Sequence, residues 1–320
     1  MRSCARPKLV ERREFILASG AVALAAPRAA LATTPKSDQL VMHDLLLDGD
    51  KRLARRSLLL VPRHISSGTK LRVLVLLHGL GETGNELLGI HAWGDRYGLV
   101  TSYDRLRALP VERALPRLRY FTDDHLAQVN RSLSQKPFGG MALLCPVTPN
   151  PYKMQPAAKT IDRYADWIEQ TLLPAAREKA NIGSGPEFTG LDGCSLGGYV
   201  GVETFLRKPE LFGSFGGVQS AFGAPTALIY AKKLAEAIRR VGPRSIRMGT
   251  SSADPYKKAN EVLSKELDRL DVPNTLSILP GPHNQPWLRE VGTLAMLLWH
   301  DRQLGVPRPP QKAHARAAPR

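Results

Sequence analysis

The sequence has few cysteines, no long hydrophobic run and no metal-binding or nucleic-acid-binding signature. Three cysteines in 320 residues are too few for a disulfide framework. The most apolar run, residues 15–26, has about 12 residues and is too short to cross a bilayer as a helix. The absence of paired Cys/His ligands and of a basic helix with interleaved aromatic residues excludes the common nucleic-acid-binding modules.

Acidic residues are also scarce. The chain has 29 Asp and Glu residues and 45 Lys and Arg residues, which gives a net charge of +16. Part of this charge lies at the two ends of the chain. Residues 1–32 carry six basic and two acidic side chains, and residues 307–320 add four basic ones, so residues 33–306 keep about +8. The tail is rich in Pro and Ala without an apolar period, and we expect it to be disordered. It is typical of a solubilising end, with binding to an anionic surface as the alternative.

Residues 1–32 have the features of an export signal. Basic residues precede the apolar run, and Ala30-Leu31-Ala32 matches an A-x-A cleavage site. Residues 11–17 resemble the twin-arginine export motif, although Glu11 stands where that motif has Ser or Thr. We therefore expect export to the periplasm or the medium by the twin-arginine route. Ordinary secretory export and an uncleaved membrane anchor are the alternatives, and after cleavage we expect no stable membrane span.

The pattern G-x-S-x-G at residues 193–197 is the most informative motif. An apolar segment, residues 187–191, precedes it and predicts a strand, and small residues 197–202 follow and predict the start of a helix. A sharp strand–turn–helix with flanking glycines exposes the central serine at a helix N-terminus, where N–H groups stabilise an anion. The motif predicts that Ser195 is a nucleophile. The alternative is a Gly-rich turn with an incidental serine.

Strands and helices alternate around this motif. Strands are predicted at residues 57–62, 71–77, 141–145, 245–250 and 275–279, and helices at residues 161–180 and 260–270. Such alternation indicates an α/β fold with a mostly parallel sheet flanked by helices, and residues 57–62 fit an antiparallel edge. Residues 95–137 do not fit the repeat, and we expect an inserted, cap-like segment that partly covers the site. The predicted organisation is thus a leader (1–32), one domain (33–306) and a tail (307–320).

A serine nucleophile needs a histidine base and a carboxylate that orients it. Of the three histidines downstream of Ser195, His314 lies in the tail and His300 ends an apolar helix. His283 follows the strand at residues 275–279, in the kind of loop where a catalytic base lies, and is our candidate. A surface turn histidine is the alternative.

The acid should lie between the nucleophile and the base. Asp254 directly follows the strand at residues 245–250, whereas the later acidic residues lie on or beyond the next helix, facing away. Asp254 is our candidate, with a helix-capping role as the alternative. For the oxyanion hole, the backbone N–H groups of Leu196, after the nucleophile, and Leu80, in the glycine-rich loop at residues 78–81, are the expected donors.

With these residues identified, the chain resembles the esterase D family of α/β-hydrolases and its feruloyl-esterase and polyhydroxybutyrate-depolymerase-like relatives. The resemblance covers about residues 55–300, apart from the insertion. It is carried by residues 78–81, 172–174, 193–199, 208–212, 217–220 and 281–283 with Trp287. It implies the α/β-hydrolase fold, with a sheet of the eight-stranded type. It leaves the substrate open, because the family contains hydrolases of very different esters and some acyltransferases.

The resemblance also bears on the two cysteines that follow the leader. An even pair in an oxidising compartment favours a disulfide. In the family's strand order, however, one strand lies between Cys145 and Cys194, which separates them by about 9–10 Å. A disulfide requires Cα atoms within about 7 Å, so we predict two free thiols.

Together these features predict an exported serine hydrolase that cleaves a small-molecule or polymer-linked carboxylic ester through an acyl-enzyme. No metal or organic cofactor is expected. Trp93, Tyr152 and Trp287 are candidates for the walls of the substrate pocket, with ordinary core positions as the alternative. An acyltransferase or a serine peptidase on the same fold, or a non-catalytic envelope protein, remains a second interpretation. The oligomeric state stays open.

Overall fold

The computed structural model describes residues 33–51 and 53–305. The predictions for the leader and the tail lie outside these residues. The strands are β1 (Leu40–Leu46), β2 (Arg56–Pro62), β3 (Val73–Leu77), β4 (Ala142–Pro146), β5 (Thr189–Gly193), β6 (Ser214–Val218), β7 (Ser245–Ala253) and β8 (Asn274–Pro282). The helices are α1 (Glu86–Asp95), α2 (Leu99–Arg107), α3 (Asp123–Gln135), α4 (Ala157–Trp167), α5 (Leu173–Lys179), α6 (Leu196–Arg207), α7 (Ala224–Val241), α8 (Lys257–Arg269), α9 (Gln285–Trp287) and α10 (Thr293–Gln303).

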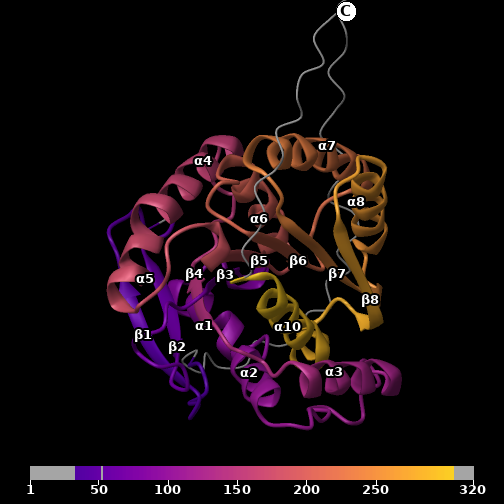
Figure 1. The fold of residues 1–320 in the computed structure, drawn as a ribbon. Helices are drawn as coiled ribbons and strands as arrows, with labels where there is room; N and C mark the ends of the chain where they lie inside the picture. The colour runs from indigo at the N-terminus through magenta and orange to yellow at the C-terminus, as the bar shows by residue number, and fades with distance from the viewer. Residues whose placement is uncertain (1–32, 52, 306–320) are drawn as a thin grey trace, which may run out of the picture. The chain divides into compact units, whose positions relative to one another are not determined.

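The strands form one sheet in the order β1-β2-β4-β3-β5-β6-β7-β8 (Figure 1). β2 runs antiparallel to both β1 and β4, and all pairs from β4 to β8 are parallel. The predicted α/β class with a mostly parallel sheet is thereby confirmed. The antiparallel strand is not the edge strand, however, because β1 pairs along its outer side. In the described part of the chain no helix has the length and apolarity to cross a membrane.

Continuous apolar runs explain why the central strands form. All five residues of β3 are buried, as are all five of β4, because helices cover both faces of the sheet. The predicted helix at residues 161–180 is divided, since a π-helical turn at Ile168–Leu172 separates α4 from α5. The predicted helix at residues 260–270 is α8.

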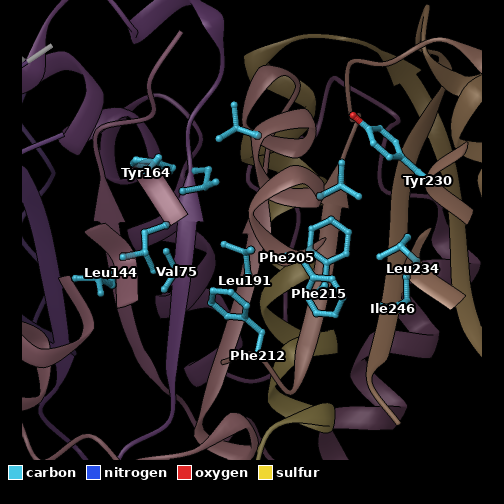
Figure 2. Close-up of a cluster of buried hydrophobic side chains, with 14 of the residues drawn as sticks. Val75, Leu144, Tyr164, Leu191, Phe205, Phe212, Phe215, Tyr230, Leu234 and Ile246 are labelled. Atoms are coloured by element: carbon cyan, nitrogen blue, oxygen red, sulfur yellow. The ribbon is translucent and has the colours of Figure 1, made fainter. Parts of the chain in front are cut away.

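Each face of the sheet has its own hydrophobic core. On one face, α4 to α8 pack over buried side chains such as Tyr164, Phe205, Phe215 and Leu234 (Figure 2). On the other face, α1, α2, α3 and α10 contribute a second core that contains Cys145 and Cys194 among its members. Both cysteines are free and buried, and β3 lies between their strands.

Residues 95–137 belong mainly to this second face. Tyr103 on α2 and Leu133 on α3 are fully buried there, together with Phe121 in the loop between the two helices. The loop also reaches the end of β8, because a Cβ added at Gly281 would lie 2.8 Å from the ring of Tyr120. The segment therefore contributes buried side chains to this core, and its Tyr120 lies beside the end of β8, close in sequence to His283.

Candidate active site

The turn between β5 and α6 holds Ser195 in a strained backbone conformation. Ser195 has φ 55° and ψ −114°, immediately before the first residue of α6. A non-glycine residue in this region costs of order 1–3 kcal/mol and persists only where the surroundings impose it. The turn places the half-buried Ser195 side chain at the N-terminal end of α6, where the helix dipole is positive.

The flanking glycines of this turn are required by close backbone contacts. A Cβ at Gly193 would lie 2.2 Å from the carbonyl oxygen of Gly197, and a Cβ at Gly197 would lie 2.1 Å from that of Leu77 at the end of β3. Both distances are far below any tolerated contact. The glycines of the motif thus allow the turn to press against the end of the neighbouring strand.

The predicted acid and base are hydrogen-bonded to each other. The Nδ1 of His283 lies 2.9 Å from Oδ1 of Asp254, and the Asp254 side chain is fully buried whereas that of His283 is 25% exposed. Two further donors fix the carboxylate, the hydroxyl of Thr250 on Oδ2 (2.5 Å) and the N–H of Tyr256 on Oδ1 (3.0 Å). The Asp254 carboxylate is therefore engaged in three hydrogen bonds. The imidazole of His283 stays accessible and is oriented through its Nδ1.

Gln219 connects this pair to the nucleophile turn. The N–H of Ser195 donates to the carbonyl of Val218 (2.9 Å), and the next residue, Gln219, has φ 52° and is fully buried. Its side-chain Nε2 donates to the hydroxyl of Ser251 (2.7 Å) and to the carbonyl of Pro282 (3.1 Å). The Gln219 amide therefore ties the carboxyl ends of β7 and β8 to the end of β6, whose last residue accepts the N–H of Ser195. Within the described residues the Ser195 hydroxyl itself forms no hydrogen bond with His283, and such contacts are often long before a substrate binds.

The loop after β3 lies directly beside the nucleophile turn. The N–H of Cys194 donates to the carbonyl of Leu77 (3.0 Å), and a Cβ at Gly79 would lie 3.7 Å from the carbonyl oxygen of Cys194. Leu80 begins a short 3₁₀ turn, and Leu196 begins α6. Among the described residues, neither the Leu80 N–H nor the Leu196 N–H has a hydrogen-bond acceptor.

Buried polar groups hold this loop in place. The N–H of Gly79 donates to the hydroxyl of Tyr97 (3.1 Å), which donates in turn to the buried carboxylate of Glu82 (2.6 Å). Arg96 pairs with the same carboxylate (3.1 Å). His78 is fully buried, its Nε2 accepts from the N–H of Thr148 (2.8 Å), and burial lowers its pKa. His78 is therefore a neutral supporting group behind the loop.

The three aromatic candidates for the pocket walls have different positions. Trp93 is 0% exposed and Trp287 is 1% exposed, and both lie in the core of the second face. Neither forms the wall of an open pocket, because each ring is buried in that core. Tyr152 is 62% exposed and stacks on Tyr199 with ring centroids 5.8 Å apart.

Tyr256 extends this aromatic surface to the predicted base. Its ring packs edge-on against the imidazole of His283, with centroids 5.7 Å apart. Partial desolvation raises the pKa of Tyr152, and the phenol of Tyr256 raises it further. A cavity of about 670 Å³ lies between the loop after β3 and the segment before Tyr152, and its lining includes Thr83, Gly84 and Asn150.

His300 does not simply end a helix, as the sequence led us to expect. It is fully buried in α10, where Nε2 lies 3.0 Å from Oδ2 of Asp192 and Nδ1 lies 2.9 Å from the hydroxyl of Ser214. These are the side-chain types of a catalytic triad, but all three residues are 0% exposed, so no substrate reaches them. The group instead connects α10 to β5 and β6.

No protein-family model matches the chain. Among curated proteins, the uncharacterized protein YbbA of Bacillus subtilis (strain 168) is 28% identical over 81 residues, which cover 22% of this chain and 32% of that protein. The match thus spans about a third of the relative's length.

Solved structures match over most of the chain. A ferulic acid esterase superposes with a TM-score of 0.59 at 15% identity, covering 83% of this chain and 98% of that one. A feruloyl esterase module from Clostridium thermocellum gives 0.56 at 13% identity, with 89% and 95% covered. The S-formylglutathione hydrolase of Staphylococcus aureus gives 0.54 at 14%, with 84% and 99% covered. These similarities agree with the strand order, and the protein has the α/β-hydrolase fold.

Proposed function

We propose that the protein is a serine hydrolase that cleaves a carboxylic ester through an acyl-enzyme. The observation that carries the proposal is the 2.9 Å hydrogen bond between Asp254 and His283, which follow β7 and β8, joined through Gln219 to the turn of Ser195. The names of the structural neighbours, feruloyl esterases and an S-formylglutathione hydrolase, support ester hydrolysis on this fold.

The proposed reaction uses Ser195 as nucleophile and His283 as base. The Nε2 of His283 takes the hydroxyl proton while the serine oxygen attacks the ester carbonyl. The same proton then passes to the leaving alcohol, and the acyl group remains on Ser195. A water molecule, activated by His283 in the same way, releases the carboxylic acid. Asp254 keeps Nδ1 protonated and stabilises the imidazolium.

The negative oxygen formed in each step requires donors. The N–H groups of Leu80 and Leu196 have no other acceptor in the described chain and flank the nucleophile, so we assign the oxyanion hole to them. Removing one such donor typically costs about 3 kcal/mol of transition-state stabilisation. The aromatic surface of Tyr152, Tyr199 and Tyr256, beside the cavity at Thr83 and Gly84, is our candidate for the binding site of the ester's larger part.

The test uses an activated ester and a covalent probe. Wild-type protein should hydrolyse p-nitrophenyl acetate, and a fluorophosphonate should label Ser195 alone, as read by peptide mass spectrometry. If the reaction with an added alcohol gives mainly a new ester instead of the free acid, the protein is an acyltransferase. If amide substrates are cleaved faster than esters, it is a peptidase. Absence of both hydrolysis and labelling would identify a non-catalytic protein with this fold.

Support of the oxyanion loop gives a separate prediction. Tyr97→Phe removes the acceptor of the Gly79 N–H and one donor of Glu82, so the loop carrying Leu80 loses its fixed position. We expect kcat for p-nitrophenyl acetate to fall by about tenfold, less than the loss of a donor itself, with KM nearly unchanged. Tyr103→Phe, a buried tyrosine on α2, is the matched control and should keep wild-type kcat. Equal kcat in both variants would contradict the role of Tyr97.

We also propose export of the protein by the twin-arginine route. The support is the sequence of residues 1–32, with Arg12 and Arg13 before the apolar run and the A-x-A site that ends at Ala32. N-terminal sequencing of protein recovered outside the cytoplasm should begin at Thr33. Full-length protein confined to the cytoplasm would contradict the proposal.

A further inference from the structure

A second cavity lies away from the predicted catalytic residues, on the face of the sheet that α3 and α10 cover. It has a volume of about 290 Å³ and lies between β7, β8 and these two helices. Its lining includes the polar residues His125, Arg247 and Thr275 and the apolar residues Val129, Leu298 and Trp299. The size suits a ligand of fragment dimensions.

Arg247 is the unusual member of this lining. Its residue is 3% exposed, and within residues 33–51 and 53–305 its guanidinium forms no hydrogen bond and no salt bridge. Nη1 is fully buried without a partner. Burial lowers the pKa of Arg247, and the charge of Asp192 only partly opposes this. A buried, unpaired charge is costly, so its presence calls for a counter-ion.

Asp192, the carboxylate whose charge acts on Arg247, is held by other donors. Asp192 accepts the N–H of Gly193 on Oδ1 (2.7 Å) and pairs with His300 through Oδ2 (3.0 Å). Asp301, close to Arg302 in sequence, pairs with both Arg72 and Arg302 at 2.7 Å. The guanidinium of Arg247 is therefore left to face the cavity.

Neighbouring residues shape the place where the guanidinium lies. A Cβ at Gly249, two residues along β7 on the same face, would come within 2.6 Å of Nη2 of Arg247, so glycine is what lets the planar group lie along the strand. His125 on α3 presents a buried Nδ1 that also lacks a partner, and burial together with Arg247 lowers its pKa. A neutral imidazole can donate a hydrogen bond to an anion without adding charge.

We propose that this cavity binds a small organic carboxylate, with its charged end on Arg247 and its apolar body between α3 and α10. An arginine presents paired N–H donors that match the two oxygens of a carboxylate. The hydroxyls of Thr275 and Ser277 and the imidazole of His125 surround the anion, whereas Val129, Leu298 and Trp299 accept an apolar group. A fully hydrated inorganic anion would leave that apolar lining unused.

This site is separate from the nucleophile turn. Cys194 bridges Val218 on β6, and Val218 pairs with Gly249 on β7, so these residues are level across the sheet. The backbone of Arg247 lies two residues below that level, but its guanidinium reaches up beside Gly249, so the site is separated from Cys194 by the width of two strands, about 10 Å. The ligand is therefore bound in addition to the ester, and its binding does not depend on the proposed reaction.

The test measures benzoate binding to the full-length chain by isothermal titration calorimetry, with Ser195→Ala present throughout to exclude turnover. We expect saturable benzoate binding and no binding of benzamide, its neutral analogue. Arg247→Met keeps an apolar stem without the charge and should weaken binding at least tenfold. Ala295→Leu fills the cavity from α10 and should weaken it equally. Arg244→Met is the matched control, because Arg244 precedes β7 and donates to the carbonyl of Pro209 instead, and it should bind benzoate like the parent.

Three results would overturn the proposal. The first is the absence of saturable benzoate binding to the parent. The second is binding that Ala295→Leu leaves unchanged, a result that stands even if Arg247→Met fails to fold. The third is tighter, Arg247-dependent binding of inorganic phosphate than of benzoate, which would assign the site to a different anion.

Discussion

Ser195→Ala is expected to lower kcat/KM for p-nitrophenyl acetate by at least about 10⁴-fold, because no other described hydroxyl stands at the turn before α6. The residual rate should come from substrate binding and from the N–H groups of Leu80 and Leu196. His283→Ala should cost a similar factor, and the double variant should lose little more than either single one, since the two residues act as a unit. Steady-state kinetics with burst-phase analysis measures these effects.

Ser220→Ala provides the matched control for this experiment. Ser220 is a buried serine next to the turn, 3% exposed, with its hydroxyl close to Gly198. Its loss should leave the rate within a few-fold of wild type. Wild-type rates for Ser195→Ala, or an equal loss for Ser220→Ala, would remove Ser195 from the mechanism.

His300→Ala is expected to lower the free energy of unfolding by about 3–5 kcal/mol, because it removes the hydrogen bond between the buried imidazole, whose pKa burial lowers, and the Asp192 carboxylate and also leaves a cavity. The substitution leaves the Asp192 carboxylate fully buried without its partner in α10, and it also removes the acceptor or donor of the Ser214 hydroxyl. The cost includes that of a buried carboxylate that has lost a hydrogen-bond donor. Urea unfolding followed by circular dichroism gives the difference from the midpoint and slope.

Ser214→Ala separates the charge from the hydrogen bond. It removes the hydroxyl contact to Nδ1 of His300 but keeps the pair with Asp192, so the expected loss is only about 1–2 kcal/mol. Equal losses in the two variants would mean that packing around α10, and not the charge of Asp192, sets the effect. Full stability of His300→Ala would show that the pair contributes nothing.

The sequence predicted those strands that consist mainly of apolar residues, because such a composition indicates burial. β3 and β4 are short apolar runs, and the segments that became β7 and β8 carry the same signal beside helical patterns. β6 was missed as a strand because Ser-Phe-Gly-Gly-Val contains two glycines, which are poor strand formers, and its burial comes entirely from neighbours on both sides. β1 was missed because its residues are mostly half-exposed at the sheet edge.

The sequence likewise indicated the residues whose role follows from local pattern. A glycine-flanked serine between a strand and a helix, and an acid and a histidine after later strands, are recognisable because parallel strands bring their carboxyl ends to one edge of the sheet. Gln219 and Tyr97 carry no such local signal. Each acts through hydrogen bonds to residues elsewhere in the chain. Gln219 donates to Pro282, and the Tyr97 hydroxyl donates to Glu82 and accepts from Gly79.

By itself, the sequence determined the fold class, the candidate triad and the strained turn, because strand periodicity and turn chemistry depend on adjacent residues. Only the tertiary structure decided that Trp93 and Trp287 are core residues, that His300 pairs with Asp192, and that Arg247 faces a cavity unpaired. Burial and charge pairing depend on which segments pack together. Those contacts join residues far apart in the chain, and no local pattern encodes them.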